Sequence, residues 1–338
     1  MQRFGVIGGG AWGTALAQIL RRAGREVVLW AREAEVVDAI NRTRENPVFL
    51  PGIKLESGIL ATANLAEAGR ADAILLVPPA QHLREISRIL APALAKHTPV
   101  IICAKGIEEK TGALMSEAAA AVLPGMPLAV LSGPTFAAEV ANGLPTAVTL
   151  AVADQVLGKS LADAFGARGF RPYLSDDLTG AQVGGAVKNV LAIACGIIMG
   201  KKFGDNARAS VITRGLAEMV RLALALGGRP ETLMGLSGLG DLVLTCTGPQ
   251  SRNLSLGMAL GEGRQLAEIL ASRRSVAEGV TSSAACAALA KKLGIEMPIS
   301  EAVAAILHHG ADVNRAIEAL LARPFKAEAQ ARHSPGKV

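Results

Sequence analysis

The glycine-rich segment GVIGGGAWGTALAQIL, residues 5–20, constrains the fold of this chain more than any other stretch. Gly8, Gly10 and Gly13 form the pattern G-x-G-x-x-G between an apolar run typical of a strand and a run of helix-forming residues. In a strand–turn–helix unit these glycines permit a tight turn, close approach of the backbone to a pyrophosphate, and close packing of helix on strand. The N–H groups at the helix N-terminus then face the phosphates. The segment predicts a dinucleotide-binding site, against the alternative of an ordinary glycine-rich turn.

The end of the second predicted strand, EVVLW (residues 26–30), bears on which dinucleotide binds. Sites for NAD usually carry an acidic residue about 20 residues after the glycines, where it accepts hydrogen bonds from the ribose. Here Arg32 follows the strand instead, and a guanidinium can pair with a ribose 2′-phosphate. We therefore expect NADPH/NADP or NADH/NAD as cofactor, with NADPH preferred. The alternative is that Arg32 is solvated and that Glu33 or Glu35 reaches the ribose.

Apolar runs alternate with helical patterns through the first half of the chain. Strands are predicted over residues 3–8, 26–30, 71–79, 99–106, 127–134 and 145–154, and helices over 14–23, 82–91 and 111–123. Strands that are apolar throughout and separated by helices indicate a mostly parallel sheet covered on both faces. Residues 1–178 are therefore expected to form a Rossmann-type α/β domain that binds NAD(P).

The pattern changes near residue 178, after which we find no convincing strand. Helices are predicted over residues 179–200, 207–227, 251–261, 265–273, 281–293, 298–309 and 312–321. A chain of 338 residues is long enough for two cores. We expect an all-α domain that binds substrate over residues 179–326, and a flexible tail over residues 327–338, which lack apolar periodicity.

Charge and composition exclude several classes of protein. The net charge is +6, but basic and acidic residues are interspersed, so we expect no nucleic-acid partner and instead a protein that handles small anions. The four cysteines are far apart and form no C-x-x-C pair, which indicates reduced thiols in the cytoplasm and no metal site. Because the strand pattern begins by Phe4, we expect no signal peptide. The longest apolar run, residues 190–200, is too short to span a membrane, so we expect no integral membrane protein.

Lys188 lies in the otherwise small or apolar segment VGGAVKNVLAIACG. Gly184 is one helical turn away on the same face, with Gly185 beside it, which clears space next to the ammonium group. Burial lowers the pKa of a lysine, so that it can exchange protons near neutral pH. We interpret Lys188 as a candidate proton donor to a developing alkoxide. The alternative is that it lies on an exposed stripe of the helix.

Other candidate residues follow strand ends or precede helices. Lys105 in AKGIE, and Gly133 and Thr135 in SGPTFAAE, lie at the carboxyl ends of predicted strands, where α/β folds bind ligands. The alternative for both segments is simple turn chemistry. The tripeptide Ser-Arg-Asn at residues 251–253 begins a helical pattern and suits a phosphate. Its alternative is a simple helix cap at Ser251 with an exposed arginine.

Several of these motifs occur together and in order: GGGAWGTALA, CAKGIE, LSGPTFAAEVANGLPTA, GGAVKNVLAIA, ITRGLAEM, GLSGLGDLVLTCT and SRN. Together they resemble bacterial NAD(P)-dependent glycerol-3-phosphate dehydrogenases over residues 3–320. The resemblance implies reversible reduction of dihydroxyacetone phosphate to sn-glycerol 3-phosphate for glycerophospholipid synthesis. It also implies a Rossmann domain joined to an all-helical domain similar to that of 6-phosphogluconate dehydrogenase, and a homodimer.

The resemblance carries the family's functional residues over to matching positions. The proton donor and acceptor falls on Lys188, held in register by Asp241 and Asn189, with Thr245 as a further candidate. Substrate-binding positions fall on Lys105, Gly133, Thr135, Lys188, Asp241, Ser251, Arg252 and Asn253. Cofactor-binding positions fall on Gly8, Gly10, Ala11, Trp12, Gly13, Arg32, Lys105, Ala137, Arg252, Val276 and Glu278. Ala11 stands where some members have serine, so only its backbone N–H is expected to contribute.

Two other functions remain as alternatives from the sequence. A β-hydroxyacid dehydrogenase also combines a Rossmann domain, a helical domain and a catalytic lysine, and the Ser-Arg-Asn tripeptide could bind its carboxylate. A non-catalytic dinucleotide sensor would keep the fold without turnover.

Overall fold

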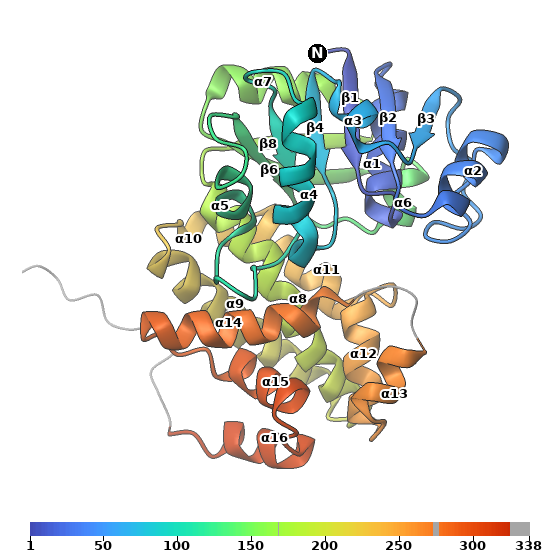
Figure 1. Cartoon of the computed structure of the whole chain (residues 1–338). Coiled ribbons are helices and arrows are strands. Elements are labelled where there is room, and N and C mark those ends of the chain that lie inside the picture. The colour runs from blue at the N-terminus through green and yellow to red at the C-terminus, as the bar shows by residue number, and fades with distance from the viewer. Residues whose placement is uncertain (168, 273–276, 325–338) are drawn as a thin grey trace, which may run out of the picture.

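The computed structural model describes residues 1–167, 169–272 and 277–324. The N-terminal part is a twisted sheet with helices packed against it, and the part from Leu178 onward is a group of helices below the sheet (Figure 1). This arrangement confirms the predicted fold class, a mostly parallel Rossmann-type sheet followed by an all-helical region. The predicted tail of residues 327–338 lies outside the described residues.

The sheet has the strand order β3-β2-β1-β4-β5-β6-β7-β8. Its strands are β1 (Arg3–Ile7), β2 (Glu26–Trp30), β3 (Ile59–Thr62), β4 (Ala73–Leu76), β5 (Val100–Ile102), β6 (Leu128–Ser132), β7 (Thr146–Val152) and β8 (Phe170–Ser175). The β6–β7 pair is antiparallel, and the other neighbouring strands pair in parallel. Strand order reverses between β1 and β4, so the carboxyl ends of these strands border the crevice where such sheets bind ligands.

Helices cover both faces of the sheet. They are α1 (Ala11–Arg22), α2 (Ala34–Thr43), α3 (Leu65–Gly69), α4 (Leu83–Leu90), α5 (Met115–Ala120), α6 (Ala137–Ala141) and α7 (Gln155–Ala164), with short turns η1 (Ala80–His82) and η2 (Ala91–Ala93). Alternate residues of β1 enter different cores, since Phe4 and Val6 pack on one face and Ile7 on the other. Such two-sided burial explains why the central strands read as continuous apolar runs.

Two strands and several short helices were not predicted. The strands β3 and β8 are the edges of the sheet, and each exposes a large side chain, Leu60 and Tyr173. The strand β8 also contains Pro172, which is tolerated at an edge. Edge strands need no continuous apolar run, so the signal used for the central strands is missing from them.

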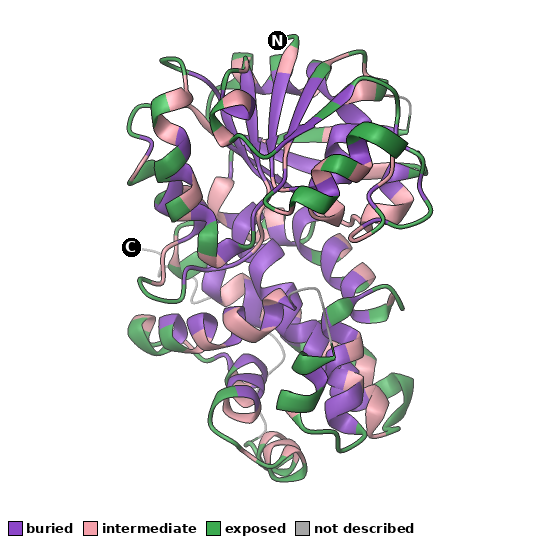
Figure 2. Ribbon diagram, turned by 45° about the vertical axis from the view of Figure 1, so that its right-hand side comes forward, coloured by how far each residue is buried: buried purple, intermediate pink, exposed green. Residues whose placement is uncertain are grey.

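The helical region is built around α8 (Leu178–Gly200). The other helices are α9 (Gly204–Ala225), α10 (Pro230–Leu233), the π-helical turn η3 (Leu236–Gly240), α11 (Asp241–Thr247), α12 (Arg252–Gly261), α13 (Leu266–Ala271), α14 (Glu278–Leu293), α15 (Pro298–His308) and α16 (Val313–Leu321). Glycines let α8 and α12 touch through their backbones, because a Cβ on Gly196 would lie 2.1 Å from the carbonyl oxygen of Leu254. Figure 2 shows the burial that results along the centre of the molecule.

Among the described residues, α8 is the one helix long and apolar enough to cross a membrane by length and composition. From the sequence alone, the apolar run at residues 190–200 is too short to span a membrane, but the helix that contains it is longer than the run. Lys188 and Asn189 interrupt the apolar run without interrupting the helix. Within the fold, 83% of its most apolar window is buried by other parts of the chain. A helix that is apolar on all sides is expected at the centre of such a bundle.

Candidate active site

The glycine-rich turn lies between β1 and α1, and each glycine has a different role. Gly8 adopts a φ of +134° beside the carbonyl of Val77. A Cβ on Gly13 would lie 1.9 Å from the carbonyl oxygen of Gly8, so the helix can pack on the turn only without a side chain there. At Gly10 no described atom beyond its two chain neighbours lies within 4 Å of such a Cβ. The turn is therefore tightly packed on its inner side and open at Gly10.

The open side of this turn coincides with the N-terminus of α1. Within the described residues no side chain caps this helix, and its first turn carries no acidic residue. The first N–H groups of an uncapped helix, together with its dipole, favour a phosphate group. The indole Nε1 of Trp12, in the same turn, is buried without a hydrogen-bond partner among the described residues. This uncapped, open turn fits the pyrophosphate of a dinucleotide.

Arg32 follows β2, and its side chain is 79% exposed. Its Nη2 lies 3.0 Å from Oε1 of Glu33, so the two residues that the sequence offered as alternatives form an ion pair with each other. Glu35 is exposed on α2. An exposed ion pair of this kind contributes at most about 1 kcal/mol, so a phosphate could readily draw the guanidinium away from Glu33.

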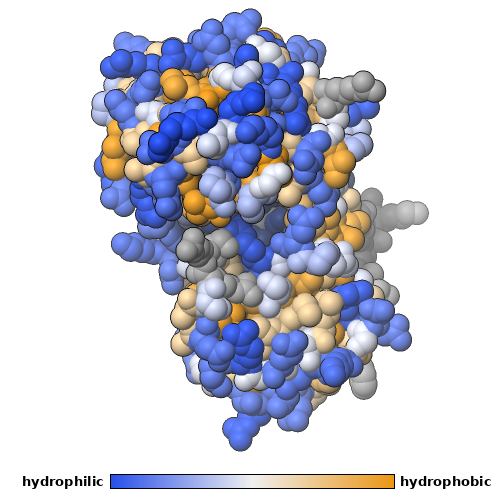
Figure 3. Space-filling model, turned by 90° about the vertical axis from the view of Figure 1, so that its right-hand side faces the viewer, coloured by the Kyte–Doolittle hydropathy of each residue, from blue (hydrophilic) through white to orange (hydrophobic). Residues whose placement is uncertain are grey.

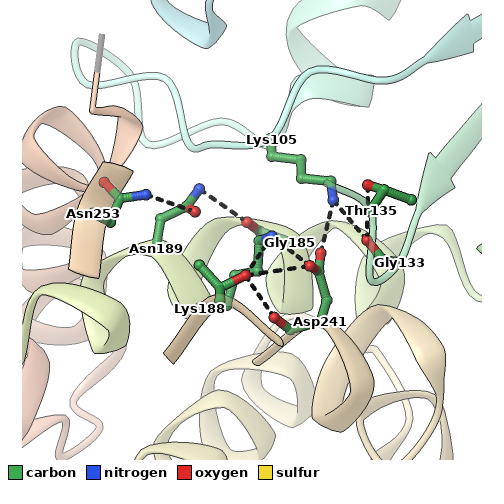
Figure 4. Close-up of polar contacts among 9 residues, drawn as sticks. Lys105, Gly133, Thr135, Gly185, Lys188, Asn189, Asp241 and Asn253 are labelled. Carbon is green, nitrogen blue, oxygen red and sulfur yellow. Dashed lines mark hydrogen bonds and ion pairs between the residues drawn. The ribbon is translucent and has the colours of Figure 1, made fainter. Parts of the chain in front are cut away.

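The centre of the site is a buried carboxylate between two ammonium groups (Figure 4). Lys188 donates from Nζ to Oδ1 of Asp241 over 2.5 Å, and Lys105 donates to Oδ2 over 2.7 Å. Asp241 is 1% exposed. Lys105 comes from the loop after β5, Lys188 from α8 and Asp241 from the start of α11. The cluster therefore joins the sheet region to the helical region.

Burial and the neighbouring charges set the protonation of Lys188. Loss of solvent lowers the pKa of its ammonium group to about 8, with the positive charge of Lys105 acting in the same direction. The Asp241 carboxylate opposes this shift. Lys188 is buried, so the exposed stripe considered as an alternative is wrong. A lysine of this pKa can both donate and accept a proton near neutral pH.

The glycines of α8 next to Lys188 serve a different purpose from the one predicted. A Cβ on Gly184 would lie 2.1 Å from the carbonyl oxygen of Ser237, so this glycine lets η3 pack on α8. A Cβ on Gly185 would lie 3.3 Å from Cγ of Lys105 and 3.0 Å from Oγ of Ser132. The two glycines therefore bring neighbouring elements close to Lys188, and Gly185 makes room for the other lysine.

Thr245 completes the surroundings of Lys188. Its hydroxyl accepts a hydrogen bond from Nζ of Lys188 over 3.0 Å and donates to the backbone carbonyl of Asp241 over 2.6 Å. Thr245 is one turn after Asp241 on α11, so both side chains face α8. A π-helical turn precedes them, a conformation often found at functional sites.

Asn189 and Asn253 form a second chain of hydrogen bonds beside this cluster (Figure 4). Asn253 donates from Nδ2 to Oδ1 of Asn189 over 3.0 Å, and its Oδ1 accepts from the backbone N–H of Gly279 over 3.0 Å. Asn189 donates to the carbonyl of Gly185 over 3.3 Å. These contacts tie the N-terminal ends of α12 and α14 to α8.

The remaining candidate residues surround this centre. Gly133, with a φ of +153°, accepts a hydrogen bond from Nζ of Lys105 at its carbonyl, which also accepts from the hydroxyl of Thr135. Ala137 begins α6. Ser251 is the N-cap of α12 and accepts from the N–H of Leu254, so the helix-cap alternative is present in the structure.

Arg252 and Glu278 stand at the first positions of α12 and α14. Burial raises the pKa of the Glu278 carboxyl to about 7, against the positive charge of Arg252 and a backbone hydrogen bond from Ala80. Val276 lies outside the described residues. In the space-filling view the surface is hollowed between the two halves of the molecule, with hydrophilic residues around the opening (Figure 3).

Sequence reasoning passed over Asn46, which contacts the glycine-rich turn. It lies in the connection between α2 and β3, and its side chain is fully buried. A single asparagine before a proline in a long connection carries no spacing signal. Only the fold shows that it reaches the turn.

Comparison with known proteins identifies the relatives of the chain. Models of the N-terminal and C-terminal parts of NAD-dependent glycerol-3-phosphate dehydrogenase match residues 3–157 and 177–318. Glycerol-3-phosphate dehydrogenase [NAD(P)+] of Parvibaculum lavamentivorans is 60% identical, over 97% of this chain and 98% of the relative. The enzyme of Rhodospirillum rubrum is 62% identical over 96% and 93%. A crystal structure of glycerol-3-phosphate dehydrogenase from Coxiella burnetii superposes with a TM-score of 0.92 at 41% identity, covering 95% of this chain and 99% of that one.

The charge cluster predicts opposite responses to two substitutions. Asp241→Asn should lower the pKa of Lys188 below about 8, because it removes the negative charge that opposes desolvation. Lys105→Met should raise that pKa, because it removes a like charge. The ¹³Cε chemical shift of Lys188 in lysine-labelled protein, followed against pH, measures both. Shifts of the same sign in the two variants would contradict this account.

Proposed function

The chain belongs to the NAD-dependent glycerol-3-phosphate dehydrogenase family, and we propose that Lys188 is the proton donor and acceptor of its reaction. That reaction is the NAD(P)H-dependent reduction of dihydroxyacetone phosphate to glycerol 3-phosphate. The observation that carries the proposal is the burial of Lys188 against Asp241 with a pKa of about 8. In the reverse direction, the neutral amine of Lys188 accepts the proton of the alcohol.

The proton transfer follows from the charges around Lys188. When bound, the dihydronicotinamide supplies a hydride to the carbonyl carbon of the substrate. Negative charge then develops on the carbonyl oxygen, and the ammonium groups of Lys188 and Lys105 stabilise it at a site with little water. Lys188 delivers its proton to that oxygen. Asp241 and Thr245 keep Nζ of Lys188 in place during this step.

We assign the substrate phosphate to the beginning of α12. The guanidinium of Arg252 stands at its first position, and the helix N-terminus adds favourable N–H groups and dipole. Asn253 keeps its acceptor occupied by Gly279, but Nδ2 has a second hydrogen that can be donated to a phosphate oxygen. The hydroxyl of Ser251 accepts a hydrogen bond as cap and still has a proton to donate. Phosphate bound there fixes the carbonyl carbon at a set distance from Lys188.

The cofactor is assigned to the crevice above β1 and β4. The uncapped start of α1 and the open space at Gly10 hold its pyrophosphate, and Arg32 selects the 2′-phosphate of NADPH. By family correspondence we also assign Lys105, Ala137, Arg252, Val276 and Glu278 to the cofactor, of which Val276 lies outside the described residues.

We further propose that the enzyme is a cytoplasmic homodimer that serves glycerophospholipid synthesis. All four cysteines are free and buried, in keeping with a reducing compartment. The homodimer is what the family resemblance implies, and the helical region has exposed apolar side chains such as Phe203 and Leu224. Sedimentation equilibrium should give twice the mass of one chain, and a monomer at micromolar concentration would contradict the dimer.

Lys188→Ala should lower kcat for dihydroxyacetone phosphate by about 10²–10⁴-fold, the usual contribution of a general acid. Binding of NADPH, followed by fluorescence, should be retained, because the assigned pyrophosphate site is on α1. Lys159→Ala, an exposed lysine on α7, is the control and should keep full activity. An active Lys188→Ala enzyme would remove the proposed role. A wild type that binds NADPH without reducing this substrate would favour the sensor, and faster reduction of a β-keto acid would favour the β-hydroxyacid dehydrogenase.

The same proposal fixes how the two directions depend on pH. For reduction, kcat/KM should be constant below pH about 8 and fall above it, because only the protonated form of Lys188 can donate. For oxidation of glycerol 3-phosphate, kcat/KM should rise up to about pH 8 and then level off, because the neutral amine is the base. Profiles that bend in the same direction would contradict the assignment.

Arg32→Ala should raise the KM for NADPH by about five- to tenfold and leave that for NADH nearly unchanged, because only NADPH carries the 2′-phosphate. Arg42→Ala is a matched control, since Arg42 is also exposed and paired with a neighbouring acid, Asp38. Equal effects of Arg32→Ala on both cofactors would show that Arg32 does not contact the 2′-phosphate.

A further inference from the structure

Asn46 holds the glycine-rich turn from a segment distant in the sequence. Its side chain is 0% exposed, and Nδ2 donates to the carbonyl oxygen of Gly9 and to the hydroxyl of Thr14, each over 2.8 Å. Its Oδ1 accepts from the backbone N–H of Phe49 over 3.1 Å. Both amide hydrogens and the carbonyl are therefore used, and the amide group has one orientation.

The contact with Gly9 also orients the next N–H group. The carbonyl of Gly9 and the N–H of Gly10 belong to one trans peptide unit, in which they point in opposite directions. Since Asn46 holds the carbonyl from the protein side, the N–H of Gly10 points away from Asn46. At Gly10 the surroundings are open to at least 4 Å where a Cβ would stand. The open side is the side assigned to the pyrophosphate.

Two further contacts restrict the position of the Gly9–Gly10 peptide. A Cβ on Gly9 would lie 2.4 Å from Cβ of Ala31, so the turn already touches the residue after β2. The hydroxyl of Thr14 donates to the Gly9 carbonyl over 3.4 Å and receives the second hydrogen of Asn46. Asn46, Thr14 and Gly9 thus form a closed set of hydrogen bonds behind the turn.

We propose that Asn46 is a positioning residue for cofactor binding, which sets the Gly9–Gly10 peptide so that its N–H donates to the pyrophosphate. The inference rests on the proposed dinucleotide site and adds to it a residue outside the glycine motif. Without the amide of Asn46, the Gly9 carbonyl keeps only the longer hydrogen bond from Thr14, and a peptide that rotates presents its carbonyl oxygen to the phosphates. Loss of the Asn46 amide should therefore weaken the binding of ligands that contain a pyrophosphate.

Asn46→Asp is the first test, because it removes both donors and keeps the acceptor for Phe49. The Kd for NADPH, measured by fluorescence titration, should rise by about tenfold or more, the scale of one lost hydrogen bond to a charged group. The Ki of adenosine 2′-monophosphate, which has no pyrophosphate, should stay within about twofold. In assays the KM for NADPH should rise while the KM for dihydroxyacetone phosphate, at saturating NADPH, stays near its wild-type value.

Gln18→Glu is the matched control. Gln18 is also fully buried, and its amide donates to the carbonyl of Lys54 and accepts from the N–H of Glu56, so neither of these hydrogen bonds involves the glycine-rich turn. It should leave the ratio of NADPH to adenosine 2′-monophosphate affinity unchanged.

Thr14→Val provides a neutral variant that decides the matter if Asn46→Asp does not fold. This substitution removes the hydroxyl that accepts one of the two hydrogen bonds from Asn46. The Kd for NADPH should therefore rise, by a smaller factor than in Asn46→Asp. Thr14→Ser, which keeps the hydroxyl, should restore the wild-type Kd. Equal weakening of NADPH and adenosine 2′-monophosphate, or no weakening in either Asn46→Asp or Thr14→Val, would overturn the inference. A wild type that binds NADPH no tighter than adenosine 2′-monophosphate would instead overturn the proposed dinucleotide site, and this inference with it.

Discussion

The pairing of two lysines with one buried aspartate is the interaction on which the site depends. Asp241 takes Lys188 on one carboxylate oxygen and Lys105 on the other, so each ammonium group has a partner in a region with little water. An unpaired charge buried at this depth would cost several kcal/mol, and removal of any one member leaves the others poorly compensated. The cluster also spans the two parts of the chain, because Lys105 follows β5 while Lys188 and Asp241 belong to α8 and α11. The chemistry of the site and the docking of the helical region on the sheet thus share one set of contacts.

Close approach of backbones makes this arrangement geometrically accessible. Glycines on α8 face the π-helical turn, the side chain of Lys105 and the backbone of α12 in succession. A single Cβ would block the backbone contacts at Gly184 and Gly196, where the approach is 2.1 Å, and would crowd the side chain of Lys105 at Gly185. The small residues of the central helix α8 therefore determine how closely the neighbouring elements pack against it. Its apolar composition follows from that central position and from burial on all sides.

Much of the architecture could be predicted from local pattern alone. The central strands are apolar on both faces, the helical half lacks strand signals, and the glycine turn stands in its strand–turn–helix context, so fold class and cofactor class followed from the sequence. The edge strands β3 and β8 did not, because exposure on one side removes the apolar run that marks a strand. The reversal at β7, which pairs antiparallel with β6, likewise leaves no local mark. Such features are decided by long-range pairing, which residue patterns over short windows do not encode.

The sequence by itself determined which residue types are available: a lysine in an apolar helix, an arginine after the second strand, and glycines at the turn between the first strand and the first helix. Only the tertiary structure decided their partners. Asp241 is 53 residues from Lys188 and 136 from Lys105, and Asn46 reaches Gly9 across 37 residues. The tertiary structure also decided that Arg32 is paired with Glu33, and that Gly184 makes room for the π-helical turn η3 beside Lys188. The physical reason is that a buried charge or amide acquires its energy and orientation from the groups packed against it, and those groups are brought together only by the completed fold.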